Sequence, residues 1–136
     1  MSQWVSVKPK GLEKVKKGML EKACAELHME LNYTVKNIKN SYGSDSVDCA
    51  LVDKKRNKTM ALGFQLAKNE TGNTYNATIK GDFFNTPFYN AEDFTDQLMQ
   101  QYRKLDLKNT LKYSGYTVSK ETVLQNGDIE LLAYSY

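Results

Sequence analysis

The side chains of this sequence that could carry acid–base, redox or metal chemistry are few and far apart. His28 is the only histidine, and Cys24 and Cys49 are the only cysteines. A general base needs a second group within reach, and one histidine with two distant cysteines has no recognisable zinc spacing. Asp45 and Asp48 flank a glycine-containing turn but lack the dense oxygen ligands of a calcium loop. We therefore predict no catalytic residue, no metal site and no cofactor.

The two cysteines are predicted to be buried, reduced thiols. Cys24 falls in a predicted helix and Cys49 in a predicted strand, and no signal peptide is recognisable before them. A redox pair is the alternative, if that helix lies over the first strands. No apolar run approaches the ~20 residues that a membrane span needs. We expect a soluble, cytoplasmic protein without membrane association.

The densest aromatic cluster lies just before a predicted helix and is the best candidate for a binding site. Its aromatic side chains could stack a base or grip a peptide, with the helix amides available to an anion. The alternative is a hydrophobic plug that fixes where the helix enters the core. We favour the plug, because the local charge is negative and would repel phosphate. The candidate residues are Asp82, Phe83, Phe84, Phe88 and Tyr89.

A basic N-terminal segment is the second candidate surface. Residues 1–22 hold six lysines and only two glutamates, although the net charge of the chain is only +3. Such a segment could bind nucleic acid or an acidic protein surface, whereas a solvated helix face is the ordinary interpretation of interspersed lysines. The chain has only two arginines, and specific phosphate and base recognition favours arginine. The candidate residues are Lys8, Lys10, Lys14 and Lys17.

The elements that must position these residues begin with a short strand at Trp4–Val7. Apolar residues from Leu12 to Leu31 recur at spacings of three and four, which predicts an amphipathic helix of about 20 residues. Short alternating runs then predict four antiparallel strands in a meander. These runs are residues 33–38, 47–52, 60–66 and 75–79, with a polar hairpin loop at 53–58.

A second helix is predicted to start at Asn90, the N-cap, with Asp93 three positions on. Leu107 and Leu111 fall out of phase with its buried stripe, so the helix either bends around the sheet or breaks near Asp106. The stripe is Phe94, Leu98, Tyr102 and Leu105, and Gly115 is the predicted stop.

The last elements are a predicted hairpin, residues 116–124 and 129–134, about a type I′ turn at Asn126-Gly127. We expect this hairpin to pair within the main sheet. The sequence thus predicts one domain, residues 1–136, of the two-layer α+β class. Two long helices would cover one face of a curved, mainly antiparallel sheet in the order β-α-β-β-β-β-α-β-β. Its first elements follow one half of a TATA-binding-protein-like fold, an analogy of topology alone.

Several short motifs resemble a small family named after hypothetical chloroplast reading frame thirty-five, with members in plastids, cyanobacteria, other bacteria and phages. The resemblance is weakest over residues 33–80. The sequence departs from the family pattern at Gln3, where a histidine is usual, and at Tyr134-Ser135-Tyr136, where the family closes on Arg-Trp. The motifs that carry it are Met1-Ser2 with Trp4 and Val7-Lys8, Asp82-Phe83-Phe84, Gln100-Gln101-Tyr102, Gly115-Tyr116-Thr117-Val118 and Asn126-Gly127-Asp128-Ile129.

The resemblance implies no activity. Some bacterial members resemble partners found in gene neighbourhoods with AAA-type ATPases, which implies an adaptor or regulatory role. We therefore predict a non-enzymatic binding module that acts through protein–protein contacts, with an AAA-type ATPase or a host factor as its partner. The alternative is nucleotide or nucleic-acid binding through the basic N-terminal segment and the aromatic cluster, and an enzyme of unrecognised type ranks third.

Overall fold

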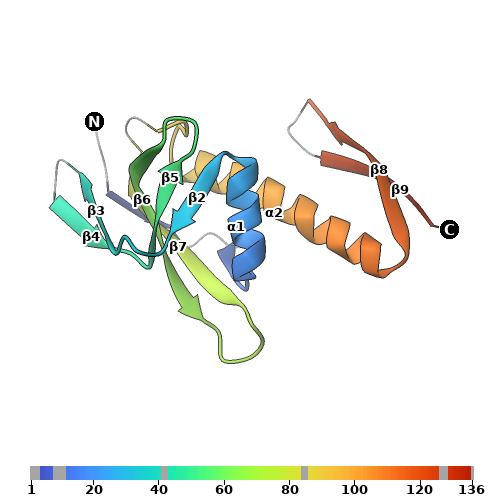
Figure 1. The fold of residues 1–136 in the computed structure, drawn as a ribbon, viewed down its shortest axis with the longest axis horizontal. Helices are drawn as coiled ribbons and strands as arrows, with labels where there is room; N and C mark the ends of the chain where they lie inside the picture. Colours follow the sequence, from blue (N-terminus) through green and yellow to red (C-terminus); the bar gives the residue numbers. More distant parts are fainter. Residues whose placement is uncertain (1–3, 8–11, 41–42, 84–85, 126–128, 136) are drawn as a thin grey trace.

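The computed structural model describes residues 4–7, 12–40, 43–83, 86–125 and 129–135. Within them the chain forms two helices and mainly antiparallel sheets, so the predicted α+β class is confirmed (Figure 1). The elements are β1 (Trp4–Val7), α1 (Lys17–Glu26), β2 (Met29–Asn32), β3 (Asn37–Asn40), β4 (Gly43–Ser46), β5 (Cys49–Asp53), β6 (Lys58–Lys68), β7 (Tyr75–Asp82), α2 (Ala91–Tyr113), β8 (Tyr116–Val123) and β9 (Ile129–Ser135).

The main sheet has five strands in the order β1-β7-β6-β5-β2, and all neighbours are antiparallel. The predicted element order lacks two strands, because β3 and β4 form a separate hairpin between β2 and β5. Residues 43–46 are glycine, serine and aspartate, which are typical of turns, yet here they pair with residues 37–40. Without that inserted hairpin, the order of the remaining elements is the predicted one. The strand predicted at residues 33–38 is wrong, because residues 33–34 form a turn between β2 and β3.

The first helix is half as long as predicted. It covers 10 residues, and His28 follows it in a left-handed conformation (φ 60°) that ends the helical turn. The expected helix residue Leu31 lies in β2 and pairs with Leu51 of β5. Val15 also lies outside the helix and forms an isolated bridge with Tyr75. The apolar residues from Leu12 to Leu31 have helical spacing, yet they belong to a loop, a short helix and a strand. All three segments contribute side chains to the same core.

Both helices cover the same face of the main sheet. Alternate residues of a strand face the same side, and Leu62, Phe64 and Ile79 on that side share one buried cluster with residues of α1 and α2. The opposite side carries a smaller cluster, in which Ala50 packs with Ile38 and Val47 of the inserted segment. The sheet is therefore covered by helices on one face and partly by the β3–β4 hairpin on the other.

The second helix matches its prediction at both ends. The Asn90 side chain accepts a hydrogen bond from the Asp93 N–H at 2.8 Å, and Gly115 (φ 85°) follows the C-cap. The helix is continuous from Ala91 to Tyr113, so of the two alternatives, a bend around the sheet or a break near Asp106, the break is wrong. At 1.5 Å per residue its 23 residues extend about 35 Å.

The final hairpin does not join the main sheet, contrary to our expectation. β8 and β9 form a two-stranded sheet of their own, with the register Val118↔Ala133 and Val123↔Ile129. Figure 1 shows the hairpin beyond the far end of α2, away from the five-stranded sheet. The length of α2 is the physical reason, because the helix carries the chain past the sheet before the hairpin begins. The predicted turn at Asn126-Gly127 lies outside the described residues.

Candidate functional site

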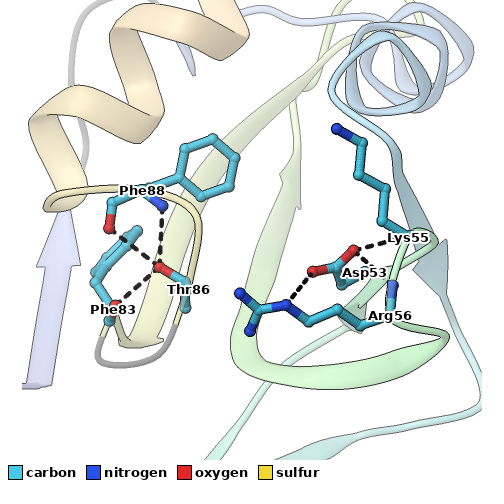
Figure 2. Close-up of polar contacts among 6 residues, drawn as sticks. All are labelled: Asp53, Lys55, Arg56, Phe83, Thr86 and Phe88. Atoms are coloured by element: carbon cyan, nitrogen blue, oxygen red, sulfur yellow. Dashed lines mark hydrogen bonds and ion pairs between the residues drawn. The ribbon is translucent and has the colours of Figure 1, made fainter.

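The predicted aromatic site is mostly part of the core. The Phe88 side chain is 5% exposed, and its ring meets that of Phe94 edge to face at 4.8 Å. Phe83 lies 5.9 Å from the same ring. Figure 2 shows how Thr86 holds this loop: its hydroxyl donates to the Phe83 carbonyl at 2.8 Å and accepts from the Phe88 N–H at 3.3 Å. These contacts correspond to a plug at the start of α2.

The remaining cluster residues divide between core and surface. Asp82 is buried at the end of β7, opposite Trp4 of β1, and Phe84 lies outside the described residues. Among the described residues of the cluster, Tyr89 is the one that presents its ring to solvent, at 90% exposure. The structure therefore brings Phe83 and Phe88 together around Phe94.

The basic N-terminal segment is only partly described. Lys8 and Lys10 lie outside the described residues. Lys14 and Lys17 are exposed, and the Lys17 ammonium lies 4.3 Å from the centroid of the Tyr33 ring, a cation–π distance. Lys14 has a left-handed backbone (φ 54°), and its N–H donates to Asn76 Oδ1 at 3.0 Å. The Lys17 side chain therefore has a local structural partner, whereas the printed contact of Lys14 is made by its backbone.

The scattered nucleophilic and acid–base side chains occupy structural positions. His28 is exposed in the α1–β2 turn, whereas Cys24 and Cys49 are free and buried, as predicted. Burial raises the pKa of the Cys24 thiol, and burial also raises the pKa of Cys49 to about 11. Both thiols are therefore protonated, and unreactive as nucleophiles, at neutral pH. No group of three His, Cys, Asp or Glu side chains in the described ranges could hold a metal ion.

The aspartates near turns join the inserted segment to the main sheet and stabilise one loop. Asp48 Oδ2 accepts from the Leu66 N–H at 2.6 Å, and Asp45 pairs with Lys80 at 3.5 Å. Figure 2 also shows Asp53, whose Oδ1 accepts from the N–H groups of Lys55 and Arg56 and whose Oδ2 lies 3.6 Å from Arg56 Nε. These contacts fix the β5–β6 loop that the polar run at 53–58 predicted.

The surface with the most unusual composition lies elsewhere, on a part that sequence reasoning did not select. We call residues 107–135, the end of α2 and the β8–β9 hairpin, the arm. Tyr113 is 93% exposed and Leu132 is 58% exposed. Of the seven large hydrophobic side chains that are exposed in the described chain, six lie on the arm. They are Leu107, Tyr113, Tyr116, Leu124, Leu132 and Tyr134.

An ion-pair network attaches the hairpin to both helices. The Lys104 side chain is 8% exposed, and its ammonium lies 3.7 Å from Glu26 Oε1 of α1 and 3.6 Å from Glu121 Oε2 of β8. Lys108 also pairs with Glu121. The Lys104 side chain is thus shared by the arm and by the described residues before 107, which we call the main unit. The sequence offered no signal for this network, because its members are far apart along the chain.

A concave site of about 560 Å³ opens between α2 and β8. One wall is formed by Lys108 and Lys112 of α2, and the other by residues 116–121 of β8. Glu121 in this wall is already neutralised by two lysines. Within the described part of the chain, Lys112 and Lys120 form no ion pair. The site therefore combines net positive charge with the apolar side chains of Tyr116 and Val118.

The sequence did contain one indication of the arm. Leu107 and Leu111 were out of phase with the buried stripe of α2, and the structure leaves Leu107 exposed and Leu111 half-buried. Tyr102 is the last buried residue of the helix. The helix then continues to Tyr113, about 16 Å further at 1.5 Å per residue. Loss of phase therefore marked the point where α2 leaves the sheet.

Fold and surface together define an α+β domain with a projecting, partly apolar arm. The chain belongs to a family described as a protein of unknown function, DUF1257, whose sequence model matches residues 24–132. The matched region begins inside α1 and reaches β9, so it includes most of the arm. Neither a curated protein nor a solved structure matches the chain. Neither described helix is long and apolar enough to cross a membrane.

Proposed function

We propose that this chain is a non-enzymatic docking module that binds another protein through the arm. The observation that carries the proposal is that six of the seven large hydrophobic side chains exposed among the described residues lie on the arm. Exposed large apolar side chains that gather on one part of a folded domain indicate an interaction site, because their contact with water is unfavourable, whereas single scattered ones are ordinary. Buried free thiols favour a reducing compartment, so we place this function in the cytoplasm.

The shape of the arm supports docking. A helix turn that leaves the core gains no burial of its own, and an isolated two-stranded hairpin is only marginally stable in water. The network of Lys104 and Glu121 nevertheless holds the hairpin against α2. The arm therefore presents its apolar side chains in a defined arrangement, which lowers the entropy that a partner would lose on binding.

The first candidate partner is an AAA-type ATPase, and a host factor is the second. The support is the resemblance of the sequence to the chloroplast reading-frame family, some of whose bacterial members resemble partners encoded beside such ATPases. The concave site carries the positive charges of Lys112 and Lys120 beside apolar side chains. We therefore expect the partner surface to carry carboxylates next to an apolar patch.

Two tyrosines of equal exposure provide a matched test. Tyr113 on the arm and Tyr89 before α2 are 93% and 90% exposed. A partner would be identified by affinity capture from the native cell with nuclease present, and its binding to the purified chain would then be measured. We expect Tyr113→Ser to weaken binding by about tenfold, as for an interface aromatic residue, and Tyr89→Ser to leave it unchanged. Equal binding by both variants would exclude the arm as the docking surface.

Nucleic-acid binding is the second candidate function. One observation favours the arm as its binding site, in place of the basic N-terminal segment and the aromatic cluster. Lys112 and Lys120 flank the concave site beside the exposed rings of Tyr113 and Tyr116. Lysines that follow a backbone and aromatic rings that stack bases are the elements of single-strand binding. Binding of a single-stranded oligonucleotide should then fall steeply with salt, with a log–log slope of about −0.7 per phosphate contact. No binding at ~50 mM salt would end this hypothesis.

A further inference from the structure

We infer that the free edge of β9 pairs antiparallel with β9 of a second copy of this chain, forming a four-stranded sheet β8-β9-β9-β8 across a twofold axis. This inference goes beyond the docking function. It concerns the backbone edge of the hairpin, whereas the proposed docking uses side chains on its faces.

The edge of β9 lacks the features that usually prevent strand pairing. Among the strands that the structure describes, β9 has one neighbour, β8. Its seven residues contain one charge, Glu130, and no proline or glycine. Natural edge strands are normally protected by lysines, prolines, bulges or a covering element. A mainly apolar seven-residue edge with a single charge is therefore suited to pairing with another strand.

The direction of the backbone groups identifies the residues that would pair. The Ser119 hydroxyl donates to the Leu132 carbonyl at 3.3 Å, so the backbone polar groups of Leu132 point towards β8. Because these groups alternate along a strand, those of Leu131 and Ala133 point to the free edge. The same alternation directs the backbone groups of Ile129 and Ser135 outwards.

A second copy fits this edge in one full-length register. Leu132 is the midpoint of Ile129–Ser135, and a twofold axis through it pairs Leu131 with Ala133 of the other copy. Both of these residues point outwards, so their N–H and carbonyl groups can exchange hydrogen bonds. Leu132 then lies opposite Leu132 of the second copy in a non-hydrogen-bonded pair, where side chains lie closest.

Charge and closure favour a second copy over an open fibre. In this register Glu130 lies opposite Tyr134 of the other copy, so the Glu130 carboxylates of the two copies are not opposite each other. The outer edge of β8 is different: it carries Lys120 and Glu121, and a register shift between Val118 and Lys120 interrupts it. A charged, bulged edge resists pairing, so assembly stops at two chains.

The first test is a proline at the outward position. Ala133→Pro removes an N–H that faces the free edge and leaves the hydrogen bonds of Leu132 to β8 intact. Sedimentation equilibrium should show a concentration-dependent dimer for the parent chain and at least a tenfold higher dissociation constant for Ala133→Pro. The far-ultraviolet circular dichroism spectrum and the melting temperature of Ala133→Pro should match those of the parent chain. This control would show that the variant folds.

The second test uses charge at position 134. In the proposed register Tyr134→Glu places two carboxylates opposite each other twice, whereas Tyr134→Lys places a lysine opposite Glu130 twice. Both variants lose the same aromatic ring, so their difference reports pairing alone. We expect the dissociation constant of Tyr134→Glu to exceed that of Tyr134→Lys by about tenfold. Equal constants would overturn the register.

A covalent test needs no stable dimer. Cys24 and Cys49 are buried, so the parent chain offers no accessible thiol among the described residues. Leu132→Cys should form an intermolecular disulfide on mild oxidation, because a facing antiparallel pair lies within disulfide range. The control is Lys120→Cys, on β8 opposite Leu132 within the hairpin. A parent chain that stays monomeric at ~100 μM, with equal cross-linking of both variants, would overturn the proposal.

The outcomes separate this inference from the proposed function. A monomer whose partner binding is weakened by Tyr113→Ser would refute the β9 pairing and retain the docking arm. A dimer that loses association in Ala133→Pro, with partner binding unaffected by Tyr113→Ser, would support the pairing and refute docking at Tyr113.

Discussion

Gly81 of β7 is the position where one added methyl group should cost this fold most. Its backbone has φ 129°, a conformation that side chains of L-residues rarely adopt. A Cβ atom placed on Gly81 would lie 1.9 Å from the Ala61 carbonyl oxygen and 2.9 Å from Leu62 Cα, both in the backbone of β6. Cβ contacts below 3.0 Å essentially do not occur, so β6 and β7 would have to separate by about 1 Å.

The magnitude of Gly81→Ala follows from two terms. Overpacking against backbone costs about 1–3 kcal/mol, and a residue forced into a glycine-only conformation costs about 1–3 kcal/mol. Their sum, about 4 kcal/mol at its midpoint, is a large part of the 5–15 kcal/mol that stabilises a typical domain. For a chain of this length it corresponds to a fall of about 15 °C in melting temperature.

The assay is thermal and urea unfolding followed by circular dichroism, with Gly18→Ala as the matched control. Gly18 lies in α1, and no atom lies within 4 Å of its added Cβ. Alanine is the better helix former, so this control should gain up to about 1 kcal/mol. A Gly81→Ala chain that melts within ~3 °C of the parent would refute the close approach of β6 and β7.

Three further predictions test the packing of the helices, the arm and the thiols. Tyr102→Phe should lower the urea unfolding free energy by about 1–2 kcal/mol, because the Tyr102 hydroxyl accepts from the Lys16 N–H at 2.8 Å; an unchanged midpoint would contradict this. Lys104→Met should accelerate amide exchange in β8 and β9 about tenfold and leave β5–β7 protected, since it releases the hairpin from both helices; equal acceleration everywhere would show that the network stabilises the whole fold. Burial raises the pKa of Cys49 from 9.0 to about 11 and raises that of Cys24 further, so the folded chain keeps protons that the unfolded chain loses above pH 9. Stability should therefore fall between pH 9 and pH 11 by up to ~1.4 kcal/mol per pH unit for each thiol, and Cys49→Ala should flatten the pH dependence of the urea midpoint.

Local patterns in the sequence were sufficient for features whose physics is local. The N-cap at Asn90, the stop at Gly115 and the β5–β6 loop depend on residues within a few positions of one another, and each is confirmed. Burial of Cys24 and Cys49 also followed from their places in apolar segments. In these cases the residues that form the stabilising contacts are neighbours in the sequence, so the pattern of residue types is enough to predict the feature.

Long-range packing decided the features that sequence reasoning missed. The apolar spacing from Leu12 to Leu31 indicates only that these residues share a core, and the partners Tyr75 and Leu51 determine that a bridge and a strand replace helical turns.

The position of the hairpin likewise depended on tertiary structure. The turn signal and alternation of residues 116–135 predicted two paired strands, and the register confirms them. Their separation from the main sheet follows from the length of α2 beyond Tyr102, and their attachment follows from Lys104 between Glu26 and Glu121. Periodicity along the chain shows which face of an element is apolar. Only the distances between elements decide whether that face meets a core or remains exposed for a partner.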